Sequence, residues 1–111
     1  MTITQIMTSE QLTTLQNRML DHFQLPQITL SSTGKRCRPV HNRKAIQAIE
    51  VADHFVQLSS LHPTDGKPVG LQAMTDEIRY NMGFTMIAWF FARIFISSIV
   101  KWLWQNYPRT I

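Results

Sequence analysis

The densest group of residues able to do chemistry is a basic cluster in the first half of the chain. Five basic residues fall within ten positions, with no acidic residue among them: Lys35, Arg36, Arg38, Arg43 and Lys44. Arginine forms paired hydrogen bonds with phosphate oxygens, and each basic charge near an anionic surface contributes about 1 kcal/mol. The cluster therefore predicts a contact with the phosphate of an anionic lipid or of a nucleic acid. The alternative is a solvated loop whose charges only keep the chain soluble.

The sequence around this cluster lacks the features of specific nucleic-acid recognition. No aromatic residue interleaves the basic ones, so there is no platform on which bases stack. Any contact with nucleic acid should therefore be non-specific and strongly dependent on salt.

Catalytic and metal-binding motifs are missing from the sequence. One cysteine and four histidines do not supply the paired close spacings of a structural zinc site. Gly34-Lys35 does not match a phosphate-binding P-loop, and no serine lies in a nucleophile elbow. Asp76 and Glu77 are adjacent, so on a helix they point about 100° apart. We therefore expect no enzyme activity, no metal or other cofactor and no small-molecule substrate.

A second chemically informative residue is Arg93, at the centre of an apolar segment over residues 82–104. Seventeen of these twenty-three residues are apolar and none is acidic. A helix of that length spans about 35 Å, enough for a bilayer core of about 30 Å. Its ten Ile, Phe, Val and Leu residues favour insertion by about 3 to 6 kcal/mol, whereas a central arginine costs about 2.5 to 3.5 kcal/mol. Insertion is therefore close to balanced, and Arg93 needs a polar partner.

A helical wheel places the polar residues of this segment on one narrow front. The front carries Arg93, Ser97, Lys101 and Thr85, with Ile96 and Val100 among them, and the opposite face is apolar. The nearest acid along the chain, Glu77, is sixteen residues from Arg93. We therefore expect the front to bind a carboxylate, carbonyl or lipid phosphate supplied by a partner inside a membrane.

Aromatic residues stand at both borders of the apolar segment. Tyr80 precedes it, and Trp102, Trp104 and Tyr107 lie at its end. Because such side chains favour the boundary between hydrocarbon and headgroups, we expect these four to be interface anchors.

The remaining sequence predicts the elements that position these residues. An apolar stripe after Thr8 and Ser9 predicts a first helix that Pro26 ends, and a second stripe predicts a helix over 43–61. The basic loop spans 31–44, and a turn rich in proline and glycine spans 62–70. One long helix is expected over 71–107, with Gly83 as a weak point and a short tail at 108–111. The predicted fold is mostly α, with a small water-facing helical region over 1–70 and one long, apolar, membrane-spanning helix near the C terminus.

Length and charge set the class of protein. A chain of 111 residues is at most one ordinary domain. Its net charge of +4 favours binding to anionic surfaces, such as phospholipid headgroups or nucleic acid. No basic segment followed by an apolar run opens the chain, so we expect no signal peptide and an N-terminal part on the side of synthesis.

Three functional hypotheses follow. The first is a non-enzymatic single-pass membrane protein, a structural or assembly subunit of a larger membrane complex or of a membrane-associated virus particle. Its partners would be other subunits, the bilayer and anionic lipid or nucleic-acid phosphate. The second is a soluble helical oligomer in which residues 84–104 form a buried helix and the basic loop binds nucleic acid non-specifically. The third, a pore lined by Arg93, Ser97 and Lys101, would bring like charges together.

Overall fold

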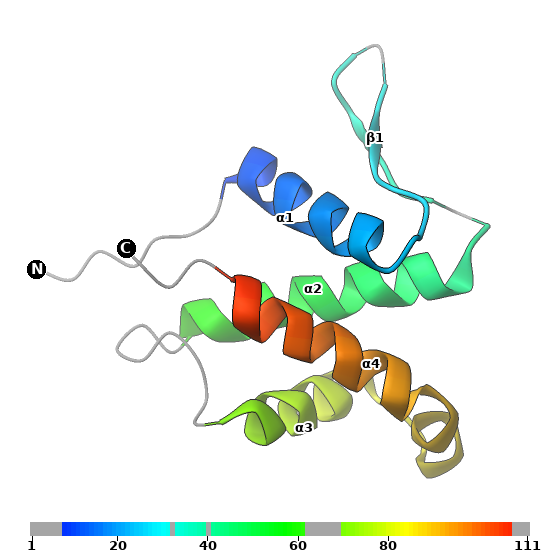
Figure 1. Cartoon of the computed structure of the whole chain (residues 1–111), viewed down its shortest axis with the longest axis vertical. Coiled ribbons are helices and arrows are strands. Elements are labelled where there is room, and N and C mark those ends of the chain that lie inside the picture. The colour runs from blue at the N-terminus through cyan, green and yellow to red at the C-terminus, as the bar shows by residue number, and fades with distance from the viewer. Residues whose placement is uncertain (1–7, 32, 40, 62–69, 108–111) are drawn as a thin grey trace, which may run out of the picture.

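The computed structural model describes residues 8–31, 33–39, 41–61 and 70–107. Their helices are α1 (Ser9–His22), α2 (Arg43–Leu61), α3 (Leu71–Met82) and α4 (Met86–Asn106), and a short antiparallel hairpin pairs β1 (Thr29–Leu30) with β2 (Arg36–Cys37). Figure 1 shows this hairpin extending away from the helices. The predicted fold class is confirmed: the chain is mostly α, with a long apolar helix near its C terminus. The predicted turn at 62–70, apart from Gly70, and the tail at 108–111 lie outside the described residues.

Side-chain caps determine where the helices begin. The Thr8 hydroxyl accepts a hydrogen bond from the backbone N–H of Gln11, and the Gln11 side chain accepts one from the Thr8 N–H. This reciprocal capping box satisfies two N–H groups that have no partner within the helix. The side chain of Asn42 accepts in the same way from the Ala45 N–H at the start of α2. These caps explain why the first two helices begin close to the residues that the sequence predicts.

The prediction of one helix over 71–107 is wrong, because the chain turns at Gly83. Gly83 has φ 70° and ψ 33°, the left-handed conformation that ends many helices and that glycine adopts without steric cost. Thr85 then caps α4, since its hydroxyl accepts a hydrogen bond from the Ala88 N–H at 3.1 Å. The two signals together, a glycine at a helix end followed by a threonine cap, separate α3 from α4 (Figure 1).

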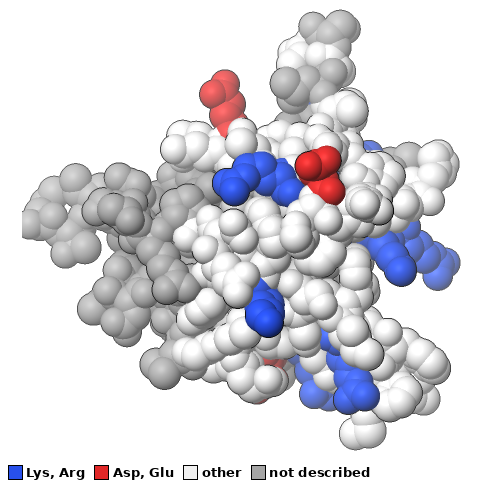
Figure 2. Space-filling model, in the orientation of Figure 1, with Lys and Arg blue, Asp and Glu red and all other residues white. Residues whose placement is uncertain are grey.

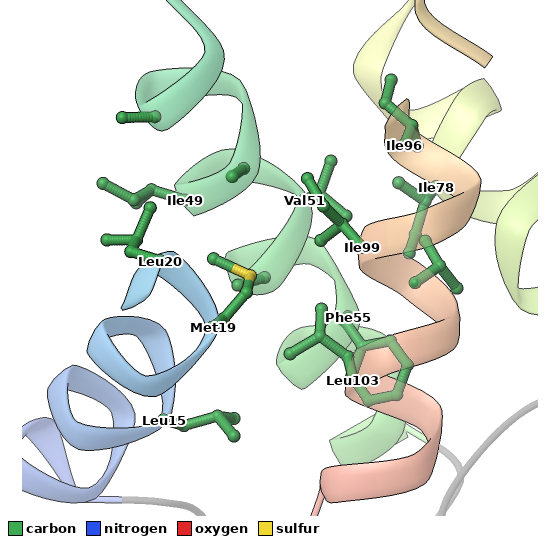
Figure 3. Close-up of a cluster of buried hydrophobic side chains, with 14 of the residues drawn as sticks. Leu15, Met19, Leu20, Ile49, Val51, Phe55, Ile78, Ile96, Ile99 and Leu103 are labelled. Carbon is green, nitrogen blue, oxygen red and sulfur yellow. The ribbon is translucent and has the colours of Figure 1, made fainter. Parts of the chain in front are cut away.

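The second half of α4 belongs to the hydrophobic core. Ile96, Ile99, Val100 and Leu103 are completely buried, and α4 contacts α1, α2 and α3. Figure 3 shows Ile99 and Leu103 facing side chains of α2, with the end of α1 on the other side of that helix. The buried side chains from the other helices include Leu15, Met19, Leu20, Ile49, Val51, Phe55, Met74 and Ile78.

This packing changes the assignment of the helix faces. The wheel placed Ile96 and Val100 on the polar front, yet both are completely buried. Ile87 and Phe91, on the opposite apolar face, are 73% and 80% exposed. The reason is that α4 is apolar over most of its circumference, so periodicity alone does not identify the face that packs against the other helices.

A matched pair of substitutions tests the position of α4. Ile99→Ala removes completely buried methyl groups and should lower the free energy of unfolding by about 2 to 5 kcal/mol. The same change at Ile94, which is 75% exposed, should alter it by less than about 0.5 kcal/mol. Denaturant unfolding of the two variants measures the difference. Equal effects at both positions would contradict the burial of the second half of α4.

Candidate functional site

The surface of α4 changes character halfway along the helix. In the first half, five large apolar side chains are exposed to between 62% and 81% of their area; they form what we term the apolar face: Met86, Ile87, Phe90, Phe91 and Ile94. Tyr80, 86% exposed near the end of α3, lies shortly before it in the chain. In the second half, the exposed residues are Ser97, Ser98, Lys101 and Gln105. One side of the first half, with Trp89, Ala92 and Phe95, packs against the core, and the other side is the exposed apolar face.

Helix α4 is also long and apolar enough to cross a membrane. Among the described residues it alone meets that criterion, over Met86–Asn106, and 22% of its most apolar stretch is buried. Length and composition support this statement and do not distinguish a spanning helix from other uses of the same surface.

Arg93 lies at the edge of the apolar face. Its guanidinium carbon is 5.1 Å from the centre of the Phe90 ring, a distance typical of a cation–π contact. The side chain is exposed, and in the described part of the chain it forms no ion pair with an acid. Arg93 helps to line an open groove of ≈ 480 Å³ between α3 and α4. The residues that line this groove are Gln72, Trp89, Arg93, Ile94, Ser97 and Ser98.

The polar groups of this groove differ in their hydrogen bonding. The Ser98 hydroxyl donates to the carbonyl oxygen of Ile94 at 2.9 Å, the helix's own backbone. The Gln72 amide nitrogen donates to a carboxylate oxygen of Asp76 at 3.0 Å. Arg93 and Ser97, both exposed, complete the polar side of the groove.

Each of the other helices places a cation over an aromatic ring of α4. Arg18 of α1 lies 5.8 Å from the Trp102 ring centre, Lys44 of α2 lies 5.7 Å from that of Phe95, and Arg79 of α3 lies 5.0 Å from that of Trp89. A second, smaller groove of ≈ 220 Å³ brings Arg43 close to the junction of α3 and α4; its other lining residues are Ile46, Gln47, Glu50, Met82 and Phe84. In Figure 2 the uncharged surface at lower right, where Figure 1 shows the start of α4, is bordered by blue side chains. Arg79, over the Trp89 ring, and Arg93, over the Phe90 ring, are the cations beside the apolar face.

The structure brings part of the predicted polar front together. Arg93 and Ser97 line the same groove, while Lys101 is exposed one turn further along. Thr85 serves as the N-cap of α4, so its hydroxyl is already engaged with the backbone. The binding of a partner by these four residues stays a prediction.

The predicted interface anchors lie in two environments. Tyr80 is exposed, whereas Trp102, Trp104 and Tyr107 are partly buried against the core. The Trp102 and His22 ring centres are 6.0 Å apart, and those of Tyr107 and Phe55 are 5.4 Å apart. Burial raises the pKa of the Tyr107 hydroxyl above its usual value. Contact of these residues with a membrane stays a prediction.

The basic cluster is distributed over different elements. Lys35 precedes β2, Arg36 belongs to it, and Arg43 and Lys44 are the first residues of α2. Arg38 forms an ion pair with Asp53 at 2.9 Å. One of the five charges is therefore neutralised within the protein, and binding of an anion by the cluster stays a prediction.

Two parts of the site were not predicted from the sequence. The first is the exposure of the apolar face, which depends on which side of α4 packs against the other helices. The second is a polar junction at Asp53, whose carboxylate accepts a hydrogen bond from the completely buried Gln16 of α1 at 2.7 Å as well as from Arg38. The sequence feature that indicates the polar junction is Gln16, a polar residue next to the apolar stripe of α1.

No known protein family, curated protein or solved structure matches the chain.

The junction at Asp53 makes a prediction about stability. Asp53→Ala removes an acceptor from the buried Gln16 amide, so it should lower the free energy of unfolding by about 1 to 3 kcal/mol. Arg38→Ala breaks only the half-exposed ion pair and should cost less than about 1 kcal/mol. Denaturant unfolding compares them, with Glu50→Ala as an exposed acid of the same helix for control. A larger loss in Arg38→Ala than in Asp53→Ala would contradict this ranking.

Proposed function

We propose that the protein is a non-enzymatic, membrane-bound structural or assembly subunit whose α4 enters a bilayer. The observation that carries the proposal is the apolar face: five large apolar side chains, each at least 62% exposed, on one side of the first half of α4. Contiguous exposed apolar surface of this kind marks a site of contact with a membrane or a protein partner. The basic residues beside it suit a membrane surface that carries negative charge.

The energetics favour burial of this face. Fully burying one large apolar side chain contributes about 1.5 to 3 kcal/mol. Partial burial of five such residues therefore supplies several kcal/mol toward membrane binding, before the attraction of the basic residues is added. The cost of the central arginine falls away if Arg93 lies at the membrane boundary and not in the hydrocarbon.

The length of the first half of α4 limits the depth of insertion. Residues 86–95 form ten residues of helix, about 15 Å, which is half of a hydrocarbon core of about 30 Å. A complete crossing would require Ile96, Ile99, Val100 and Leu103 to leave the core. We therefore propose that the folded chain enters one leaflet. The single-pass topology, with the N-terminal part on the side of synthesis, stays a prediction for a chain whose α4 has left the core.

The assembly role is the part of the proposal that concerns partners. A helix that reaches one leaflet leaves the exposed basic residues Lys35, Arg43 and Lys101 available to other subunits of a membrane complex or a membrane-associated virus particle. The apolar face also supports the second candidate, a soluble oligomer in which two copies cover each other's α4. The two candidates differ in whether lipid or protein covers the face.

Substitution of the apolar face tests the membrane proposal. Phe90→Gln, Phe91→Gln and Ile94→Gln, made together, should abolish flotation with vesicles, because the change removes about 4 kcal/mol or more of apolar transfer free energy. The folded state should persist, since these side chains are exposed. Thr14→Gln with Thr29→Gln, also at exposed positions, should float like the wild-type chain.

Extraction from cell membranes separates the two candidates. We expect the wild-type chain to need detergent and to resist salt or carbonate, and the triple variant to be released. A wild-type chain that is soluble without detergent and forms an oligomer that the triple variant converts to a monomer would overturn the membrane proposal and support the soluble oligomer.

A further inference from the structure

A binding site adjoins the apolar face on the side of α3. The groove lined by Gln72, Trp89, Arg93, Ile94, Ser97 and Ser98 combines a guanidinium, a hydroxyl and an amide with the side of an indole ring. We propose that this groove binds the phosphate of an anionic phospholipid. This inference rests on the proposed membrane function and adds the ligand that one part of the surface recognises.

The chemistry of the groove suits a phosphodiester. Arg93 presents several N–H donors in a planar fork, which matches phosphate oxygens better than a lysine would. The Ser97 hydroxyl lines the same groove and can donate a further hydrogen bond to one of the two non-bridging oxygens. Because the Gln72 amide nitrogen donates to Asp76, its carbonyl oxygen is oriented as the acceptor for a hydroxyl of the headgroup.

A second cation supports negative charge in the groove. Arg79 lies 5.0 Å from the ring centre of Trp89, which is one of the residues that line the groove. Asp76 accepts a hydrogen bond from Gln72, another lining residue. Two arginines therefore act on the site against one acid.

The position of the groove identifies the source of the phosphate as a lipid. Ile94 belongs both to the groove and to the apolar face, and Arg93 stacks on Phe90 of that face. A phosphate held by Arg93 would therefore have its attached acyl chains beside Phe90 and Ile94, where apolar surface is exposed. Nucleic acid and free phosphate have no apolar portion to cover these residues.

The depth of the groove agrees with this assignment. Arg93 lies seven residues beyond Met86, or about 10 Å along the helix axis. When Arg93 lies at the phosphate level of one leaflet, Met86 lies about 10 Å deeper, within the hydrocarbon of the same leaflet.

Vesicle binding by the purified full-length chain tests the site. The wild-type chain should bind phosphatidylcholine vesicles that contain phosphatidylglycerol more tightly than vesicles of phosphatidylcholine alone. Arg93→Gln should lower this preference at least about fivefold. Arg18→Gln removes an exposed arginine that also stacks on an α4 ring, and it should change the preference less than about twofold.

Two serines give a second, finer comparison. Ser97→Ala should weaken binding to the anionic vesicles about threefold, because it removes a donor to the phosphate. Ser98→Ala should leave binding unchanged, because that hydroxyl is already bonded to the Ile94 carbonyl. Soluble glycerol 3-phosphate should not displace the protein from vesicles.

The possible failures are distinct. If the wild-type chain binds neither kind of vesicle, the proposed membrane function fails. If it binds both, but Arg93→Gln and Arg18→Gln change the preference equally, the groove is not the phosphate site and only general charge attraction acts. If glycerol 3-phosphate displaces the protein, the ligand is a soluble phosphate ester and the lipid assignment is overturned.

Discussion

The packing of the second half of α4 against the other helices is the interaction on which the rest of the structure depends. Ile96, Ile99, Val100 and Leu103 give the small fold a substantial part of its buried apolar surface. Because a helix is rigid over two or three turns, fixing these residues also fixes the direction of residues 86–95. The exposure of Phe90, Phe91 and Ile94 is therefore a consequence of how the core is built.

This constraint also resolves the position of Arg93. In an isolated spanning helix, the arginine would lie at the centre of the hydrocarbon, where a charge is costly. In the folded chain it lies where the apolar half of the helix meets the polar, exposed residues Ser97 and Lys101. Arg93, the central residue of the apolar segment, therefore lies at the boundary between the apolar surface of the first half of α4 and the polar surface of the second half.

Much of the helical organisation could be predicted from the sequence, because it is encoded locally. The start of the first helix next to Thr8 and the apolar stripe of the second helix involve residues only a few positions apart, and both predicted helices are confirmed. The end of α3 is also encoded locally, by Gly83 and Thr85, although the sequence pattern predicts only a weak point in one long helix there. Glycine inside an apolar segment is common, and its effect depends on whether the chain needs to change direction there.

The parts that could not be predicted depend on contacts between residues far apart in the sequence. Which side of α4 packs is decided by the shape of the surface that α1, α2 and α3 offer it, since the helix is apolar on most sides. The junction of Gln16, Arg38 and Asp53 likewise joins residues as much as 37 positions apart. The candidate groove has the same origin, because Gln72 and Arg93 come from different helices.

The use of one helix for both core and surface has a thermodynamic consequence. A ligand that binds only the folded state stabilises that state by an amount that grows with its concentration relative to its dissociation constant. Any bilayer or partner that holds residues 86–95 in their folded direction therefore also stabilises the packing of Ile99 and Leu103 against α2, because these two residues belong to the same helix. By the same linkage, loosening the core weakens attachment, so the two properties rise and fall together.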